Sequence, residues 1–434
     1  MNMLKRFASI ALALTVTTSL FAQDSADLER RLRELEQKIA QMQAAQPNAD
    51  LAEVRRQIEA LGQEIESLKT RQTETVATTD TTTYGMGAAA SKVYRADEGI
   101  SFGGYGEFLY QNLEDRTDTA DALRAILYTG YKFNDRVIFN SEIEYEHANT
   151  ERSGQVEVEF AYLDYLITPA ANVRAGLLLM PVGITNEQHE PTAFFAARRS
   201  QLDSRIIPTT WNELGVGVFG EVGRFSYRGY MTTALTSSGI TAAGIRGSRQ
   251  RGSQAKADDL AFVGRVDFHP FEGTIIGASA YTGNSGQENT FGGRVTLAEV
   301  HADARFRGFE VRALAARGSI DDAAAINAAN HLTGAASVGE SFGGWYVEGG
   351  YDVAPLVTAR ELSVIPFVRY ESFDTQREVP TGFLRNRAND QNILTFGVAF
   401  KPIPQTVIKI DWQNVDNEAN TGLNQWNIAL GYIF

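Results

Sequence analysis

The sequence predicts an all-β protein, a 16-stranded antiparallel transmembrane β-barrel preceded by an N-terminal α-helical coiled coil. From Ile100 to Phe434, apolar residues recur at every second position in sixteen segments of roughly ten residues. The connections between these segments alternate between tight turns and longer polar loops. Beyond the N-terminus, no apolar run approaches the roughly 20 residues of a membrane helix. If the chain crosses a membrane, it must therefore do so as a closed barrel.

The alternation of faces is clearest in the third and fourth segments. Residues 136–147 place Val137, Phe139, Ile143 and Tyr145 on one face and Asn140, Glu142, Glu144 and Glu146 on the other. In the stretch VEVEF, Val156, Val158 and Phe160 alternate with Glu157 and Glu159. A barrel with lipid outside and water inside accounts for both faces. A soluble β-sandwich would give the same alternation with its apolar face inward, and Asp164 falls on the nominal lipid face.

Three segments precede the barrel, which we assign to residues 100–434. Residues 1–22 indicate a cleavable secretory signal peptide, because Lys5 and Arg6 precede an apolar stretch that ends at Ala22. Residues 24–71 predict a periplasmic coiled coil, with apolar residues at 4-3 spacing in two runs. A short amphipathic helix packed on its own domain is the alternative for this part. Residues 72–99, rich in threonine, alanine and glycine, predict a flexible linker.

Composition excludes several functions. The net charge of -13 and the pI near 5.0 argue against nucleic-acid binding. The absence of cysteine excludes disulfides, thiolate metal sites and cysteine nucleophiles. The histidines, His147, His189, His269, His301 and His331, show no metal-ligand spacing. A hydrolase assembled from His301, Asp303 and the serine of GNSG is the alternative. We therefore expect no enzymatic activity, no cofactor and no metal site.

The signal peptide, the coiled coil and the terminal sequence LGYIF resemble those of bacterial outer-membrane porins, most closely the phosphate-selective porin O/P family. The stretch VRAGLLLMPVGITNEQHEPTAFF is similar to the place where members of that family leave the fifth strand and enter the third long loop. The resemblance covers the barrel from about Ile100. It implies a water-filled channel in the bacterial outer membrane for small hydrophilic solutes or ions, with anion or phosphate selectivity as an option.

The resemblance also implies partners. In porins a terminal phenylalanine, with apolar residues at alternate preceding positions, is the signal that the barrel-assembly machinery recognises; here the positions are Phe434, Tyr432, Leu430 and Ile428. The same residues could simply face outer-membrane lipid. Porins of this architecture are usually homotrimers, whereas isoleucine and leucine at the seam of the coiled coil favour two strands. We expect a homotrimer, with the coiled coil in the periplasm.

A constriction is expected at the loop of residues 180–210, which is long and unusually apolar. In porins the third long loop folds into the barrel. We expect this loop and the inward strand faces to line the pore through Arg198, Arg199, Arg205, Glu142, Glu144, Glu157, Glu159, Arg124, Lys132, Arg174 and Arg228. Separated charges across a narrow pore set ion preference. The alternative is that the arginines pair with the glutamates and only fix the loop. The barrel has few lysines, which weakens the case for phosphate.

A structural role is the main alternative to a channel. The barrel could anchor a periplasmic tether or another cell-envelope structure that the coiled coil holds. Nothing in the N-terminal segment resembles a peptidoglycan-binding domain, and conductance separates the two functions.

Overall fold

The computed structural model describes residues 82–434, apart from 152, 288–290 and 359. The predicted signal peptide, the coiled coil and the first part of the linker lie outside the described residues. The strands are β1 (Gly99–Leu113), β2 (Thr119–Lys132), β3 (Val137–Glu146), β4 (Val156–Thr168), β5 (Ala171–Leu179), β6 (Asn212–Val222), β7 (Phe225–Thr233), β8 (Leu260–Phe268), β9 (Thr274–Asn284), β10 (Arg294–Phe306), β11 (Phe309–Ile320), β12 (Ser341–Tyr351), β13 (Ser363–Glu378), β14 (Asp390–Ile403), β15 (Thr406–Asn417) and β16 (Gln425–Ile433).

Short helices interrupt the loops. Among the described residues, the α-helices are α4 (Lys92–Arg95), α5 (Gln201–Arg205) and α6 (Ala323–Ala329). The 3-10 helices are η1 (Pro191–Ala193), η2 (Ser237–Gly239), η3 (Arg246–Ser248), η4 (Gly334–Ala336), η5 (Ala354–Leu356) and η6 (Arg387–Asn389). Within the described part of the chain, no helix is both long and apolar enough to cross a membrane.

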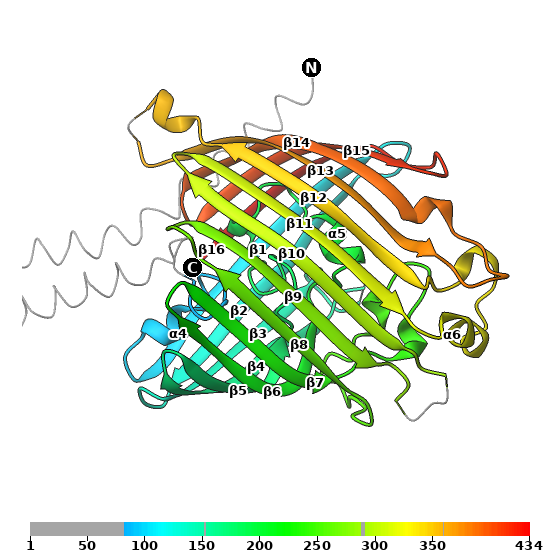
Figure 1. Cartoon of the computed structure of the whole chain (residues 1–434). Helices are drawn as coiled ribbons and strands as arrows, with labels where there is room; N and C mark the ends of the chain where they lie inside the picture. Colours follow the sequence, from blue (N-terminus) through cyan, green and yellow to red (C-terminus); the bar gives the residue numbers. More distant parts are fainter. Residues whose placement is uncertain (1–81, 152, 288–290, 359) are drawn as a thin grey trace, which may run out of the picture. The chain divides into compact units, whose positions relative to one another are not determined.

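The described strands close into one antiparallel barrel, as predicted (Figure 1). Each strand pairs with its neighbours in the chain, and β1 closes the barrel against β16. The pairing runs from Tyr105 opposite Ile433 to Leu113 opposite Gln425. Beyond β16, the Phe434 amide donates to the Gly104 carbonyl at 2.9 Å, and the Gly104 amide donates to the Phe434 carbonyl at 3.0 Å. The last residue thus completes the seam, and no strand edge is left unpaired there.

The two ends of the barrel differ in the length of their connections. At one end, two-residue turns at 169–170, 223–224, 307–308 and 404–405 join consecutive strands. Gly223 and Gly308 adopt φ angles of 62° and 86°, which such turns require and which glycine accepts without strain. The opposite end carries the long connections 180–211, 234–259 and 321–340. The alternation predicted from the sequence is confirmed.

The outer face of the barrel is apolar and the inner face is charged. Aromatic pairs surround the short-turn end: Tyr131 with Phe133, Phe225 with Phe268, and Phe309 with Tyr351, at 4.8, 4.9 and 4.4 Å between ring centres. Trp426, Tyr432 and Phe434 on β16 and its end also lie on the exposed face, as predicted. An aromatic girdle and an apolar belt suit a surface in contact with lipid. The alternative of a soluble sandwich is excluded by the closed topology.

A β-bulge in β4 changes which of its residues face inward, so the faces differ from those predicted. Glu142 pairs with Phe160, but the next residue of β3 pairs with Val158, so Glu159 is an extra residue. Glu159 and Phe160 both point inward and are 1% and 0% exposed. The prediction that Phe160 faces outward is wrong. The same shift turns Asp164 into the barrel, where its carboxylate binds Arg174 at 2.8 Å.

Residues 83–94 are buried or partly buried inside the barrel, so the prediction of a flexible linker is wrong for this part of 72–99. The amides of Ala88 and Ala89 donate to the Glu190 carboxylate at 3.0 and 2.8 Å. Asn140 of β3 donates its side-chain amide to the Ala90 carbonyl at 2.9 Å. A Cβ on Gly87 would lie 2.6 Å from Glu190 Oε1. Small residues therefore permit close packing here, although their composition is also typical of a linker.

Replacing Glu190 should release this segment. We expect Glu190→Ala to speed hydrogen exchange at the amides of Ala88 and Ala89 by roughly ten- to hundredfold, because each loses a charged acceptor. Hydrogen-exchange mass spectrometry of peptides covering 85–91 measures the effect. The control is Glu151→Ala, which changes an exposed loop glutamate. Unchanged protection in Glu190→Ala would show that the segment is held by other contacts.

Candidate functional site

The loop of residues 180–211 folds into the barrel and reaches strands on several sides of it (Figure 1). The Ala197 amide donates to Asp411 of β15 at 2.6 Å. The Ser200 hydroxyl donates to Glu371 of β13, also at 2.6 Å. On the side of β8, an Arg265 guanidinium donates to the Gly183 carbonyl. The inward fold that the porin resemblance implies is present.

The composition of the loop explains why it lies inside. Met180, Val182, Ile206, Ile207 and Trp211 are fully buried and belong to one apolar cluster with inward side chains of the wall. Burying an aliphatic side chain of this size stabilises the fold by about 1.5–3 kcal/mol. If the loop lay on the surface, its apolar side chains would remain exposed to water and would not contribute this stabilisation. At the start of α5, the Ser200 hydroxyl accepts from the Leu202 amide at 3.1 Å and caps the helix.

A cavity of about 260 Å³, which we call the charged cavity, lies among β1–β4, this loop and residues 234–259. Its acidic residues come from β1, β3 and β4: Glu107, Glu144, Glu146, Glu157 and Glu159. Its basic residues are Arg124 of β2 and, from the two loops, Arg198, Arg199, Arg246, Arg249 and Arg251. Acidic groups thus line the wall, and most basic groups face them from the loops.

Only some of the charged residues that line the charged cavity form ion pairs with one another. Arg124 binds Glu107 at 2.9 Å, and Arg251 is in contact with Glu157. Arg249 instead donates to the Pro208 carbonyl at 3.1 Å, and one terminal nitrogen of Arg199 is buried without a hydrogen-bond partner within the described residues. Some arginines therefore hold the loops in place, while Arg199 keeps one buried N–H donor that no described residue accepts.

The arginines also crowd one another. Burial, together with the nearby guanidinium of Arg124, lowers the pKa of Arg199. Burial and the guanidinium groups of Arg249 and Arg199 lower the pKa of Arg246. Arginines of the two loops therefore lie close enough together to interact electrostatically.

The structure brings six of the eleven predicted constriction residues to the charged cavity: Arg124, Arg198, Arg199, Glu144, Glu157 and Glu159. The other five lie elsewhere. Lys132 donates to the Ala96 carbonyl at 3.1 Å, Arg174 binds Asp164, and Arg228 binds Glu187 and Asp267. Arg205 ends α5 with an exposed side chain, and Glu142 contacts His189.

Sequence reasoning missed the second basic loop. Arg246, Arg249 and Arg251 lie between β7 and β8, in a stretch that the sequence predicts only as one of the longer polar loops. The signal was available in RGSRQRGS, where three arginines recur within six residues. The glycine and serine residues around these arginines are typical of a surface loop, so the composition did not indicate that the arginines line the interior. Glu107 and Glu146, both on the acidic side of the charged cavity, were also missed.

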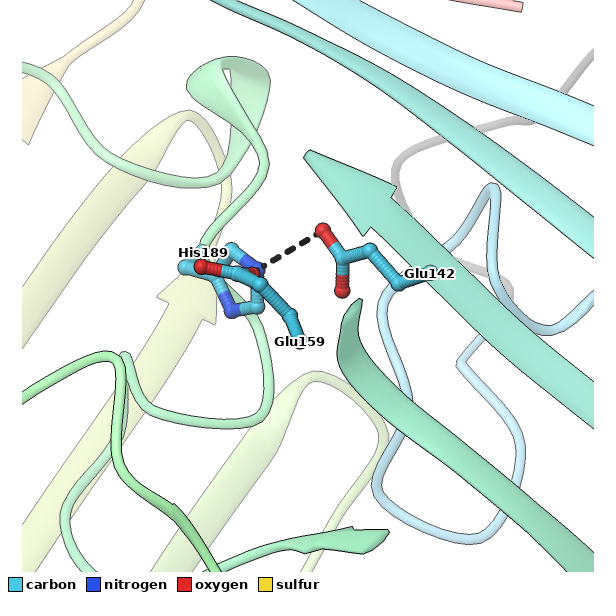
Figure 2. Close-up of side chains that lie close together, drawn as sticks. All are labelled: Glu142, Glu159 and His189. Atoms are coloured by element: carbon cyan, nitrogen blue, oxygen red, sulfur yellow. Dashed lines mark hydrogen bonds and ion pairs between the residues drawn. The ribbon is translucent and has the colours of Figure 1, made fainter. Parts of the chain in front are cut away.

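His189 joins the inward loop to the wall (Figure 2). Its Nε2 lies 3.2 Å from Glu142 Oε1 and 3.0 Å from Glu159 Oε2, and all three side chains are almost fully buried. Burial acts to lower the pKa of His189, but the two carboxylates outweigh it and raise that pKa to about 10. In the absence of another cation, a protonated imidazole therefore bridges the loop to β3 and β4.

The residues proposed for a hydrolase do not assemble. His301 has Glu299 and Asp267 at its two ring nitrogens, at 2.9 and 3.0 Å. Asp303 binds Arg312, and the Ser285 hydroxyl donates to the Gly293 carbonyl. The serine therefore lacks the histidine that would activate it.

Comparisons with known proteins support the fold. An uncharacterized protein of Aquifex aeolicus (strain VF5) is 35% identical over 367 residues, covering 81% of this chain and 83% of that protein. The chain belongs to the same family as this Aquifex protein. No family model matches the chain, so the phosphate-selective porin O/P family is not shown.

Among solved structures, OmpT of Vibrio cholerae, an outer-membrane protein, has a similar fold. Its loop L8 deletion mutant gives a TM-score of 0.52 at 14% identity and covers 78% of this chain and 100% of that one. A trimer form of OmpT gives a TM-score of 0.50 with the same identity and the same coverage. The chain thus has the fold of outer-membrane β-barrels.

Breaking the pair between Arg124 and Glu107 should be costly. We expect Arg124→Met to lower the free energy of unfolding by about 3–5 kcal/mol, because it leaves a buried carboxylate unpaired. Adding Glu107→Gln to that variant should restore part of the loss. Urea unfolding in lipid vesicles provides the measurement, with the exposed Arg387→Met as the control. A double variant less stable than Arg124→Met would contradict this account of the pair.

Proposed function

We propose that this protein is an outer-membrane porin, a water-filled channel through which small hydrophilic solutes or ions diffuse. The observation that carries the proposal is the charged cavity, in which glutamates of the wall face arginines of two inward loops. Opposed charges in a narrow passage order water and solutes and set ion preference. The apolar outer belt and the fold shared with outer-membrane barrels support a location in the bacterial outer membrane.

Anion selectivity is the finer part of the proposal. Within the described residues, one buried guanidinium nitrogen of Arg199 has no hydrogen-bond partner, and five arginines of the two loops line the charged cavity. A guanidinium suits phosphate and carboxylate groups because it donates two parallel hydrogen bonds. Preference for phosphate rests on this chemistry and on the resemblance to the phosphate-selective porin O/P family. The proposal includes no enzymatic activity.

The remaining assignments complete the proposal. Residues 1–22 would be removed as a signal peptide, and residues 24–71 would form a periplasmic coiled coil. The apolar outer wall offers a surface for homotrimer formation, and OmpT of Vibrio cholerae has been solved in a trimer form. The short-turn end, at which β1 begins, would face the periplasm, because outer-membrane barrels carry short turns on that side.

A periplasmic tether anchored by the barrel is the second candidate. It is favoured by the predicted coiled coil and by the extent to which the inward loop and residues 83–94 occupy the interior. Such an anchor would need no charged cavity, so conductance decides between the two.

The native protein should conduct. In planar bilayers with a potassium chloride gradient, we expect stepwise openings in groups of three, and a reversal potential of the sign that anion selectivity gives. Added phosphate should lower chloride current if phosphate competes for the arginines. No conductance would favour the tether, and single openings without grouping would contradict the trimer.

Variants of the charged cavity provide the control for this measurement. Neutralising the loop side with Arg199→Gln and Arg249→Gln should move the reversal potential toward cation selectivity. Neutralising the wall with Glu144→Gln and Glu157→Gln should move it in the opposite direction. Arg387→Gln, an exposed position outside the charged cavity, should change nothing. If the arginine variants and the glutamate variants shift the reversal potential identically, the charged cavity does not lie on the conducting path.

Phe434 should matter more for insertion than for conduction. We propose that it forms the barrel-assembly signal with Tyr432, Leu430 and Ile428. Its ring is half exposed on the outer face, away from the charged cavity. We expect Phe434→Asp to lower the amount of protein in the outer membrane severalfold, measured by quantitative immunoblotting of membrane fractions. The control is Phe271→Asp, at an exposed phenylalanine in the β8–β9 turn. Normal levels of Phe434→Asp would count against the signal.

A further inference from the structure

Three ligand atoms converge where the inward loop meets the wall. His189 Nε2, Glu142 Oε1 and Glu159 Oε2 lie within 4.8 Å of one another (Figure 2). They come from the loop, from β3 and from β4, and the three side chains are almost fully excluded from solvent. The bulge in β4 contributes directly, because Glu159 is its extra residue. The fold thus brings together residues that are far apart in sequence.

The orientation of the imidazole is fixed from its other side. His189 Nδ1 lies 3.0 Å from the Asn186 carbonyl, to which an Nδ1–H donates. A hydrogen bond of this kind fixes the ring orientation and tautomer of histidines that bind metals. The tautomer with hydrogen on Nδ1 presents the Nε2 lone pair to both carboxylates.

A proton alone does not satisfy this cluster. The hydrogen bond of His189 Nε2 runs to Glu142 Oε1. Glu142 Oε2 is buried without a hydrogen-bond partner within the described residues, and Glu159 Oε2 has only an ion-pair contact, at 3.0 Å, with the same Nε2. The nearby Arg124 guanidinium is already engaged by Glu107 and by the His189 carbonyl. One imidazolium leaves the Glu142 and Glu159 carboxylates with one negative charge, and the buried Glu144, which hydrogen-bonds Glu159, adds another carboxyl group. A divalent cation with a neutral imidazole would balance both carboxylates, which burial otherwise penalises.

We propose that Glu142, Glu159 and His189 bind one divalent first-row transition-metal cation, for which zinc is the probe. One imidazole nitrogen and two carboxylate oxygens are ligands that zinc accepts at about 2.0–2.2 Å. Tetrahedral coordination at these lengths places ligand atoms roughly 3.4 Å apart. The observed separations from Nε2, 3.2 and 3.0 Å, need to open by only a few tenths of an ångström. The proposal is independent of conduction.

His301 provides a matched comparison. It is also buried between two carboxylates, but Glu299 lies at Nδ1 and Asp267 at Nε2, on opposite sides of the ring. The Arg265 guanidinium lies 2.9 Å from the same Nε2. Its carboxylates therefore do not converge with one ring nitrogen, and a positive charge already occupies the position of a cation. We expect no metal site at His301.

Zinc titration of the purified full-length protein tests the proposal. After treatment with a chelator, isothermal titration calorimetry with zinc chloride at pH 7 should give one zinc per chain. His189→Asn and Glu142→Gln should each weaken binding by roughly tenfold or more, since loss of even an outer-shell partner has effects of that size. His301→Asn should bind as the native protein does. No stoichiometric binding by the native protein, or equal affinity in His189→Asn, would overturn the proposal.

Cobalt provides a test that needs no variant. If either substitution prevents folding, cobalt(II) added to the native protein should develop the visible absorption of a four- or five-coordinate N/O site. One equivalent of zinc should abolish that absorption. A spectrum that matches cobalt in buffer would overturn the proposal.

Discussion

A closed barrel of sixteen strands encloses more space than its inward side chains can fill. Most other features of this structure follow from how that space is occupied. Along one part of the wall, the apolar loop after β5 and residues 83–94 pack against each other and against inward aromatic residues. Charged side chains line the space that is left, because they cannot face lipid and need water or partners inside.

Two adjacent residues hold these inner segments together. Glu190 accepts the backbone amides of Ala88 and Ala89, while His189 contacts two carboxylates on β3 and β4. Arg124 donates to the His189 carbonyl and extends the same network to Glu107. The loop therefore owes its position to buried polar contacts as well as to apolar packing. Such contacts are directional, so they fix where the arginines stand relative to the glutamates.

The period-two pattern was sufficient to predict the barrel, its strand count and most of its faces. It failed at β4, because a single extra residue changes the phase without changing composition. It failed for residues 83–94, because small residues serve close packing and flexibility equally well. The cluster at His189 could not be predicted, since its partners lie 30 and 47 positions earlier and only the pairing of β3 with β4 brings them together. The charged cavity was predicted in part, because strand faces are periodic and loop paths are not.

The contacts of the inward loop with distant strands also determine at which stage of folding the charged cavity can form. Ala197 and its acceptor Asp411 are 214 residues apart in sequence, and Ser200 and Glu371 are 171 apart. Contacts of such long range form late, because the entropy of closing the intervening chain opposes them. An incomplete barrel that lacks β13–β16 would therefore have no fixed position for the inward loop. The passage would acquire its final width only when the C-terminal strands join the wall, so assembly and the shaping of the interior finish together.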